Sequence, residues 1–125
     1  MFIPNQKVSI PVKDMTRARR FFIEKLGQTF LFEDEHAVVL ESSNTQISLV
    51  PSKEAGKATY SLVTWLVENI DQHIDNLRRA GIQFEEYDFG NIKTVNGKAK
   101  LGKNYVAWFK DSEDNLLAIA ETVNH

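Results

Sequence analysis

The chain has 125 residues, of which 42% are hydrophobic and 26% charged, with a formal net charge of −2 at pH 7 and no cysteine. This length suffices for one globular core, whereas the near-neutral charge and the lack of any apolar run approaching ~20 residues argue against nucleic-acid and membrane partners. From the length we expect one domain, residues 1–125. Because cysteine and a signal-like segment are both absent, we expect the protein to be located in the cytoplasm.

The first half of the sequence predicts a strand, a helix and three more strands. Apolar residues alternate over 8–12 and then recur with helical spacing from Met15 to Leu26. Asp14 stands at the N-cap position of this helix, and Gly27 stands where a helix normally ends. Short strands separated by polar turns are expected at 28–32, 37–41 and 45–50.

The second half repeats the same order of elements. A strand over 60–67 is followed by a helix. Asn69 and Gln72 form a capping-box-like pair at the start of this helix, and Gly81 stands at its end. The long connection 88–102 contains Asn96-Gly97, a strong signal for a tight hairpin turn. The remaining strands are expected at 82–87, 104–109 and 116–121.

Matching positions in the two halves indicate an internal duplication. Val67 lies 55 positions after Val12, and Gly81 lies 54 positions after Gly27, so the halves align almost without gaps. An isolated half would be too small for a reliable core, so both halves are expected to share one domain. The sequence therefore predicts two βαβββ modules, at about 6–50 and 59–122, joined by a connector at 51–58.

A series of short segments carries a family resemblance over nearly the whole chain. They are Val12-Lys13-Asp14-Met15, Phe21-Phe22, Leu26-Gly27, Ala80-Gly81-Ile82, and Phe109-Lys110-Asp111 followed by Asp114-Asn115. In order and spacing they resemble the vicinal oxygen chelate superfamily, which includes glyoxalase I, extradiol dioxygenases, fosfomycin-inactivating transferases and bleomycin-resistance proteins. The resemblance implies an α+β fold whose two modules curl their mixed sheets into a shared cleft, with the helices outside.

The same resemblance implies where a divalent metal would be held, because the family takes ligands from the first and last strands of each module. By position these ligands fall on Lys7 and Ser48 in the first module and on Leu62 and Ala118 in the second. Zinc, manganese and iron sites take imidazole, thiolate or carboxylate, which none of these side chains supplies. We therefore expect no metal and no other cofactor.

The remaining ionisable residues do not assemble a catalytic site either. The acidic turn 33–35 has too few oxygen ligands at workable spacing for a hard cation, and no nucleophile stands beside a base. The histidines lie on no predicted sheet strand: His36, His73 and His125. The sequence therefore predicts no catalytic residues, and Lys7 is expected to meet either an anionic group of a ligand or a neighbouring glutamate.

Strand alternation selects the side chains that would line the cleft. Trp108 and Tyr60 are candidate stacking surfaces, although Trp108 is equally compatible with an ordinary core position. Phe89 belongs to the stretch 88–102, which is either a flap at the cleft mouth or a solvated insertion. The candidate ligand-binding residues are Lys7, Ser9, Gln46, Ser48, Tyr60, Leu62, Thr64, Phe89, Trp108 and Ala118.

Three functions are compatible with these features. The first is a metal-free small-molecule binding protein, similar to bleomycin-resistance proteins, with an aromatic or amphiphilic ligand that meets both Trp108 and Lys7. The second is a metal-dependent lyase or dioxygenase, and the third is a regulatory or structural relic whose cleft is filled by its own side chains. The family resemblance also implies a homodimer, with the apolar residues Met1-Phe2-Ile3-Pro4 as a candidate contact.

Overall fold

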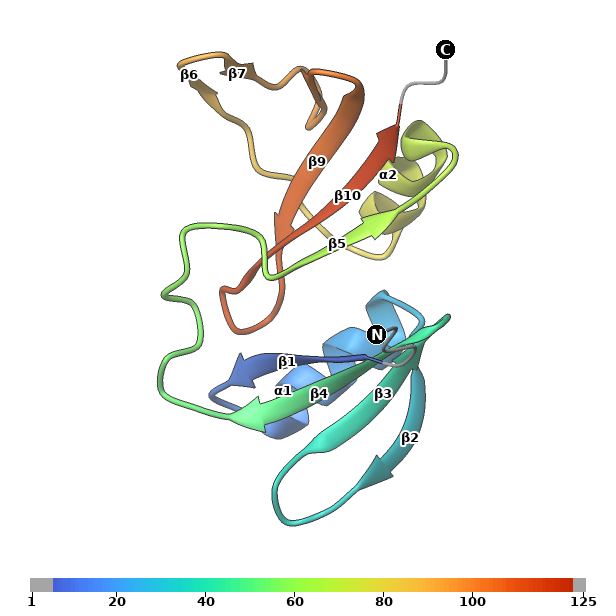
Figure 1. Cartoon of the computed structure of the whole chain (residues 1–125), viewed down its shortest axis with the longest axis vertical. Coiled ribbons are helices and arrows are strands. Elements are labelled where there is room, and N and C mark those ends of the chain that lie inside the picture. Colours follow the sequence, from blue (N-terminus) through green and yellow to red (C-terminus); the bar gives the residue numbers. More distant parts are fainter. Residues whose placement is uncertain (1–5, 123–125) are drawn as a thin grey trace, which may run out of the picture. The chain divides into compact units, whose positions relative to one another are not determined.

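Two four-stranded mixed sheets, each with a helical segment, form the described residues 6–122 of the computed structural model (Figure 1). One unit contains the chain up to Lys57 together with Asp111–Asn115, and the other contains Ala58–Lys110 and the chain from Leu116 onward. The predicted α+β fold of two βαβββ modules is confirmed. Within residues 6–122, no helix has the length and apolar character needed to cross a membrane. The candidate contact Met1-Phe2-Ile3-Pro4 and His125 lie outside the described residues.

The first module has the strand order β1-β4-β3-β2, in which β1 runs parallel to β4 and the other pairs are antiparallel. A parallel pair needs a crossover, and the helical segment between β1 and β2 provides the start of it. The elements are β1 (Lys7–Val12), α1 (Met15–Arg20), the π-helical turn η1 (Phe21–Lys25), β2 (Thr29–Glu33), β3 (Val38–Ser42) and β4 (Thr45–Pro51).

Both predicted ends of the first helix are confirmed. The Asp14 carboxylate accepts a hydrogen bond from the Arg17 backbone N–H at 3.0 Å, as an N-cap does. Gly27 follows the helical segment with a φ of +69°, a left-handed conformation that glycine adopts without steric cost. Phe22 at the centre of the segment is fully buried, so the segment is held by packing against the sheet.

Alternation divides the first sheet into a face that carries the helix and a helix-free face. Ile10 pairs with Leu49, and both are fully buried. The Arg19 guanidinium of α1 lies 4.2 Å from the ring centroid of Phe30, which pairs with Leu40, so these residues share the helix face. The residues next to them along each strand therefore occupy the helix-free face.

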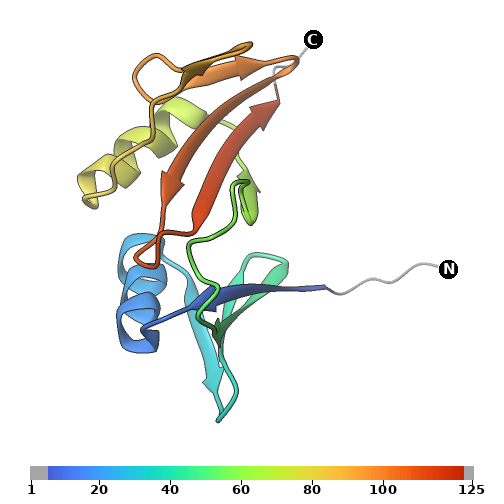
Figure 2. The same ribbon diagram turned by 90° about the vertical axis from the view of Figure 1, so that its left-hand side faces the viewer.

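The second module has the strand order β5-β10-β9-β8, again with the first strand parallel to the last. Figure 2 shows its helix against one face of the sheet. A separate two-stranded hairpin, β6-β7, lies in the long connection before β8. The elements are β5 (Val63–Leu66), α2 (Ile70–Arg79), β6 (Asp88–Phe89), β7 (Ile92–Lys93), β8 (Ala99–Leu101), β9 (Asn104–Lys110) and β10 (Leu116–Thr122).

The prediction of a strand over 82–87 is wrong. Only Phe84 forms a bridge there, to Phe109, and Ala99–Leu101 supplies the outer strand of the sheet instead. The Glu86 carboxylate is bonded by Thr94 and by the Gly97 backbone, so this segment is tied to the following loop after a single bridge. The Asn96-Gly97 turn is confirmed, with φ values of +54° and +83°.

An aromatic and aliphatic core fills the space between the second sheet and α2. The Phe109 ring stacks with Trp65 at 6.5 Å between centroids and meets Phe84 edge-on at 5.6 Å. Ile70 and Ile74 of α2 are buried, and their separation of four residues places both on one face of the helix. The α2 N-terminus is anchored by the Asn69 cap to Gln72 and by the Glu121 carboxylate, which accepts from the Ile70 backbone N–H at 2.8 Å.

Candidate functional site

The helix-free face of the first sheet carries two rows of candidate residues across neighbouring strands. In one row Lys7 pairs with Gln46, and Gln46 pairs with Glu41. In the next row Ser9 pairs with Ser48, and Ser48 is buried at 3% exposure. The structure therefore brings together the four candidates of the first module, Lys7, Ser9, Gln46 and Ser48.

The helix-free face of the second sheet carries an equivalent row. Thr64 pairs with Ala118, and Ala118 pairs with Trp108 on the other side. Leu62 lies just before β5, where its backbone N–H donates to the Leu116 carbonyl at 2.9 Å. Thr64, Ala118 and Trp108 thus lie side by side across three strands, with Leu62 at the entrance to the first of them.

Three aromatic side chains form a continuous contact series on this face, which we call the aromatic surface: Tyr87, Phe89 and Trp108. The Tyr87 ring meets Trp108 edge-on at 5.5 Å and Phe89 edge-on at 5.7 Å, both between centroids. Phe89, on the β6-β7 hairpin, is 60% exposed, whereas Tyr87 and Trp108 are half-buried. Burial, with a smaller effect of Glu85, raises the pKa of Tyr87, so its phenol is neutral near pH 7.

The two tryptophans of the chain lie on opposite faces of one sheet. Trp65 belongs to the stacked core with Phe109, while Trp108 contacts the aromatic surface. The ring neighbours of Trp108 are the half-buried Tyr87 and, through it, the exposed Phe89. Tyr60 is 67% exposed, and no ring contact among the described residues joins it to the aromatic surface.

The four positions that the family resemblance assigns to metal ligands are occupied by Lys7, Ser48, Leu62 and Ala118, none of which has a side chain that typically binds zinc, manganese or iron. Across residues 6–122, no group of three or more His, Cys, Asp or Glu side chains is arranged to hold a metal ion. His73 lies on α2, where its Nδ1 contacts the Asn69 carbonyl at 2.9 Å, and His36 lies in an exposed turn. Both histidines are off the sheets, as the sequence predicted.

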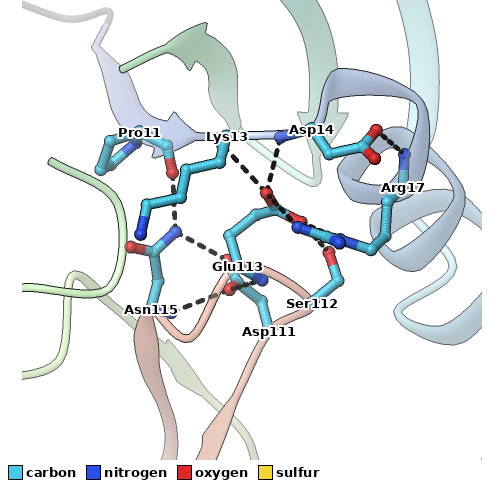
Figure 3. Close-up of polar contacts among 8 residues, drawn as sticks. All are labelled: Pro11, Lys13, Asp14, Arg17, Asp111, Ser112, Glu113 and Asn115. Carbon is cyan, nitrogen blue, oxygen red and sulfur yellow. Dashed lines mark hydrogen bonds and ion pairs between the residues drawn. The ribbon is translucent and has the colours of Figure 1, made fainter. Parts of the chain in front are cut away.

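A buried polar cluster at the start of α1 is the feature that sequence reasoning missed (Figure 3). The Glu113 side chain has no solvent exposure and accepts five hydrogen bonds, two of them from the backbone N–H groups of Lys13 and Asp14 at 2.9 and 2.8 Å. The other donors are Ser112 and the Arg17 guanidinium, which binds in bidentate fashion at 2.8 and 3.1 Å. Burial alone raises the pKa of Glu113, but these bonds outweigh it and lower the pKa to about 2.

The same turn is held from within by a second buried carboxylate. Asp111 accepts from the backbone N–H groups of Glu113 and Asn115 at 2.8 and 2.9 Å and from the Asn115 side-chain amide at 3.0 Å. Asn115 in turn donates to the Pro11 carbonyl at 2.8 Å (Figure 3). Burial raises the pKa of Asp111 despite these bonds. Both buried carboxylates and the Asn115 amide are therefore hydrogen-bonded within the protein, which stabilises the turn.

Comparison with known proteins agrees with this architecture. The sequence model of the Glyoxalase/Bleomycin resistance protein/Dioxygenase superfamily matches residues 6–119. No curated protein sequence is significantly similar to the chain.

Solved structures share the fold at low sequence identity. The chain is similar to a glyoxalase/bleomycin resistance protein/dioxygenase from Alicyclobacillus acidocaldarius, with 18% identity, TM-score 0.73, and coverage of 99% of this chain and 96% of that one. A lactoylglutathione lyase from Agrobacterium tumefaciens gives 11% identity, TM-score 0.71, and coverage of 93% and 91%. The fosfomycin resistance protein FosX from Listeria monocytogenes gives 11% identity, TM-score 0.70, and coverage of 100% and 95%.

Proposed function

Because the chain belongs to the glyoxalase/bleomycin resistance protein/dioxygenase superfamily, we propose that it is a metal-free protein that binds a small aromatic or amphiphilic molecule. The observation that carries this proposal is the aromatic surface of the second module, where Trp108, Tyr87 and Phe89 lie in edge-on contact. Trp108 lies next to Ala118, whose methyl group occupies little space on the same face.

Physical chemistry favours a flat apolar ligand at this surface. Ring contacts contribute about 0.5–1.5 kcal/mol beyond the burial of area, and an aromatic side chain is rigid enough to lose little entropy when a ligand covers it. Phe89 is 60% exposed on a two-stranded hairpin, so its ring has apolar area left to bury. A ligand that covers Phe89 and Trp108 would remove that area from water.

The metal-free part of the proposal rests on side-chain chemistry. Lys7, Ser48, Leu62 and Ala118 stand at the positions that the family resemblance assigns to metal ligands, and they offer no imidazole or carboxylate. A metal-dependent lyase or dioxygenase would need ligands from elsewhere. A metal that binds the folded state raises its free energy of unfolding, by about 2.7 kcal/mol at a hundredfold excess over Kd. Because we expect no binding, zinc, nickel, manganese and iron(II) should leave the melting temperature unchanged. A rise of several degrees that a chelator abolishes would contradict this.

Ligand binding can be tested with single-tryptophan variants. We would screen flat aromatic carboxylates and amphiphiles by thermal shift and titrate each hit into Trp65→Phe, which retains only Trp108, and into Trp108→Phe, which retains only Trp65. The fluorescence of Trp108 should change on binding, whereas that of the core Trp65 should not, because the two rings lie on opposite faces of the sheet.

Alanine variants then separate binding from stability. Trp108→Ala and Phe89→Ala should each weaken binding by about 1–3 kcal/mol if the ring stacks on the ligand. Tyr60→Ala serves as the matched exposed control and should leave affinity unchanged if the site is confined to the aromatic surface. If Trp108→Ala instead unfolds the protein at a cost of about 3–5 kcal/mol, as a core tryptophan would, or if every hit binds both alanine variants normally, the aromatic surface is not the site.

A further inference from the structure

The helix-free face of the first sheet has a polar hollow that the aromatic surface does not include. Its volume is about 560 Å³. The residues that line it come from the start of β1, the end of β3 and the turn into β4, namely Gln6, Lys7, Glu41, Ser43, Asn44, Thr45 and Gln46. Every lining residue carries a polar side chain, so the hollow does not suit an apolar ligand.

Two opposite charges stand at either side of this hollow. Lys7 pairs with Gln46 and Gln46 pairs with Glu41, so the three side chains project from one face of three adjacent strands. The backbones of Lys7 and Glu41 are two strand spacings apart, about 10 Å. Across residues 6–122, neither Lys7 nor Glu41 takes part in an ion pair, and the uncharged Gln46 stands between them.

We propose that this Lys7–Glu41 hollow binds a small zwitterion whose ammonium and carboxylate are several bonds apart, such as a dipeptide. The ligand carboxylate would meet the Lys7 ammonium, and the ligand ammonium would meet the Glu41 carboxylate, each as a charge-assisted hydrogen bond. The Gln46 amide, with one acceptor oxygen and two donor hydrogens, is placed to bind the peptide group between the two charged ends.

Charge complementarity sets this ligand apart from simple ions. A simple anion would be attracted by Lys7 but repelled by Glu41, and a simple cation would be attracted by Glu41 but repelled by Lys7. A zwitterion is attracted at both ends. The hydroxyl and amide groups of Ser43, Asn44 and Thr45 at the rim supply further hydrogen bonds without adding charge. All the residues that line the hollow belong to the first module, whereas the aromatic surface belongs to the second.

The test uses a series of peptides with identical ends and growing separation. Glycine, diglycine and triglycine would be titrated into the full chain by calorimetry or by NMR shift perturbation. We expect diglycine or triglycine to bind more tightly than glycine, because the free amino acid is too short to reach both charges. N-acetyl-diglycine lacks the ammonium and diglycine amide lacks the carboxylate, so each should bind at least about tenfold more weakly than diglycine.

Variants of the two charges complete the test. Lys7→Met and Glu41→Gln should each lower affinity for diglycine at least about tenfold, whereas the matched exposed controls Lys25→Met and Glu24→Gln should not. The double exchange Lys7→Glu with Glu41→Lys should restore binding to within several-fold, with the peptide reversed. The proposal would be overturned if Lys7→Met or Glu41→Gln bound diglycine as tightly as wild type. It would also be overturned if the blocked peptides bound as tightly as diglycine, or if no peptide bound at millimolar concentration. Trp108→Ala should keep its diglycine affinity, so failure of the aromatic site and failure of this one are distinguishable.

Discussion

Replacing Glu113 by glutamine tests the buried cluster at the start of α1. The amide oxygen can still accept from the backbone N–H groups of Lys13 and Asp14, but the amide nitrogen then points its hydrogens at the Arg17 donors. The Glu113→Gln variant therefore loses the bidentate ion pair and gains a contact between donors in a site with no solvent exposure.

The pKa of Glu113 gives the size of the effect. Folding lowers it from 4.5 to about 2, and each pKa unit corresponds to about 1.4 kcal/mol, so the ionised carboxylate stabilises the fold by about 3 kcal/mol near neutral pH. Because the folded-state pKa is the lower one, this stabilisation is complete above about pH 5 and is lost as the pH falls towards 2.

The assay is urea unfolding of wild type and Glu113→Gln, each at pH 7 and at pH 2.5. We expect a difference of about 3 kcal/mol at pH 7 that shrinks markedly at the acidic pH. The raised pKa of Asp111 has the opposite sign, since its protonation at low pH relieves a buried charge. Comparing the two proteins at each pH largely cancels that effect, because both contain Asp111.

Glu24→Gln is the matched control. Glu24 pairs with Arg20 on the surface of the same helical segment, and both side chains are about two-thirds exposed, so the change should cost less than about 1 kcal/mol at either pH. A Glu113→Gln variant as stable as wild type, or one whose deficit is the same at both pH values, would refute the assignment of a stabilising carboxylate.

Three further predictions concern packing, backbone and assembly. Gly97→Ala should lower the free energy of unfolding by about 3 kcal/mol, because a Cβ there would lie 2.9 Å from Phe84 at a φ of +83°. Gly90→Ala, with a φ of +57° and open space around the Cβ, should lower it by about 1 kcal/mol. Thermal unfolding measures both. Phe22→Ala should cost about 3–5 kcal/mol in urea unfolding, and Phe32→Ala, 49% exposed, less than about 1 kcal/mol. Sedimentation at high micromolar concentration should show a homodimer, and a strict monomer would contradict that expectation.

The faces of the strands could be predicted because the alternation of apolar and polar side chains is a local pattern with a period of two residues. Ser9 and Thr64 are 55 positions apart, and the structure pairs them with Ser48 and Ala118 respectively. The family resemblance assigns Ser48 and Ala118 to metal-ligand positions in the last strand of each module, and each of them lies in the strand next to the first strand of its sheet. A slip of one residue would have moved apolar side chains off the helix face, so alternation decides which side chains share a face of the sheet.

The residues that were missed depend on contacts between distant parts of the chain. The sequence pattern predicts a strand at Tyr87, yet the Tyr87 ring packs on Trp108 from a segment that forms only one bridge to the sheet. Glu113 lies in a polar turn, where a carboxylate normally faces water. Its burial follows from hydrogen bonds to Lys13 and Asp14, about 100 positions away, which no local pattern reports.

The turn that carries Glu113 belongs to the first unit, although it lies in the second half of the sequence. The chain leaves the second unit after Lys110, contributes Asp111–Asn115 to the first, and returns at Leu116. A fragment that stops at Lys57 would contain the first sheet and helix but would leave the backbone N–H groups of Lys13 and Asp14 without their acceptor. The first module is therefore completed by a turn that the second half of the sequence supplies.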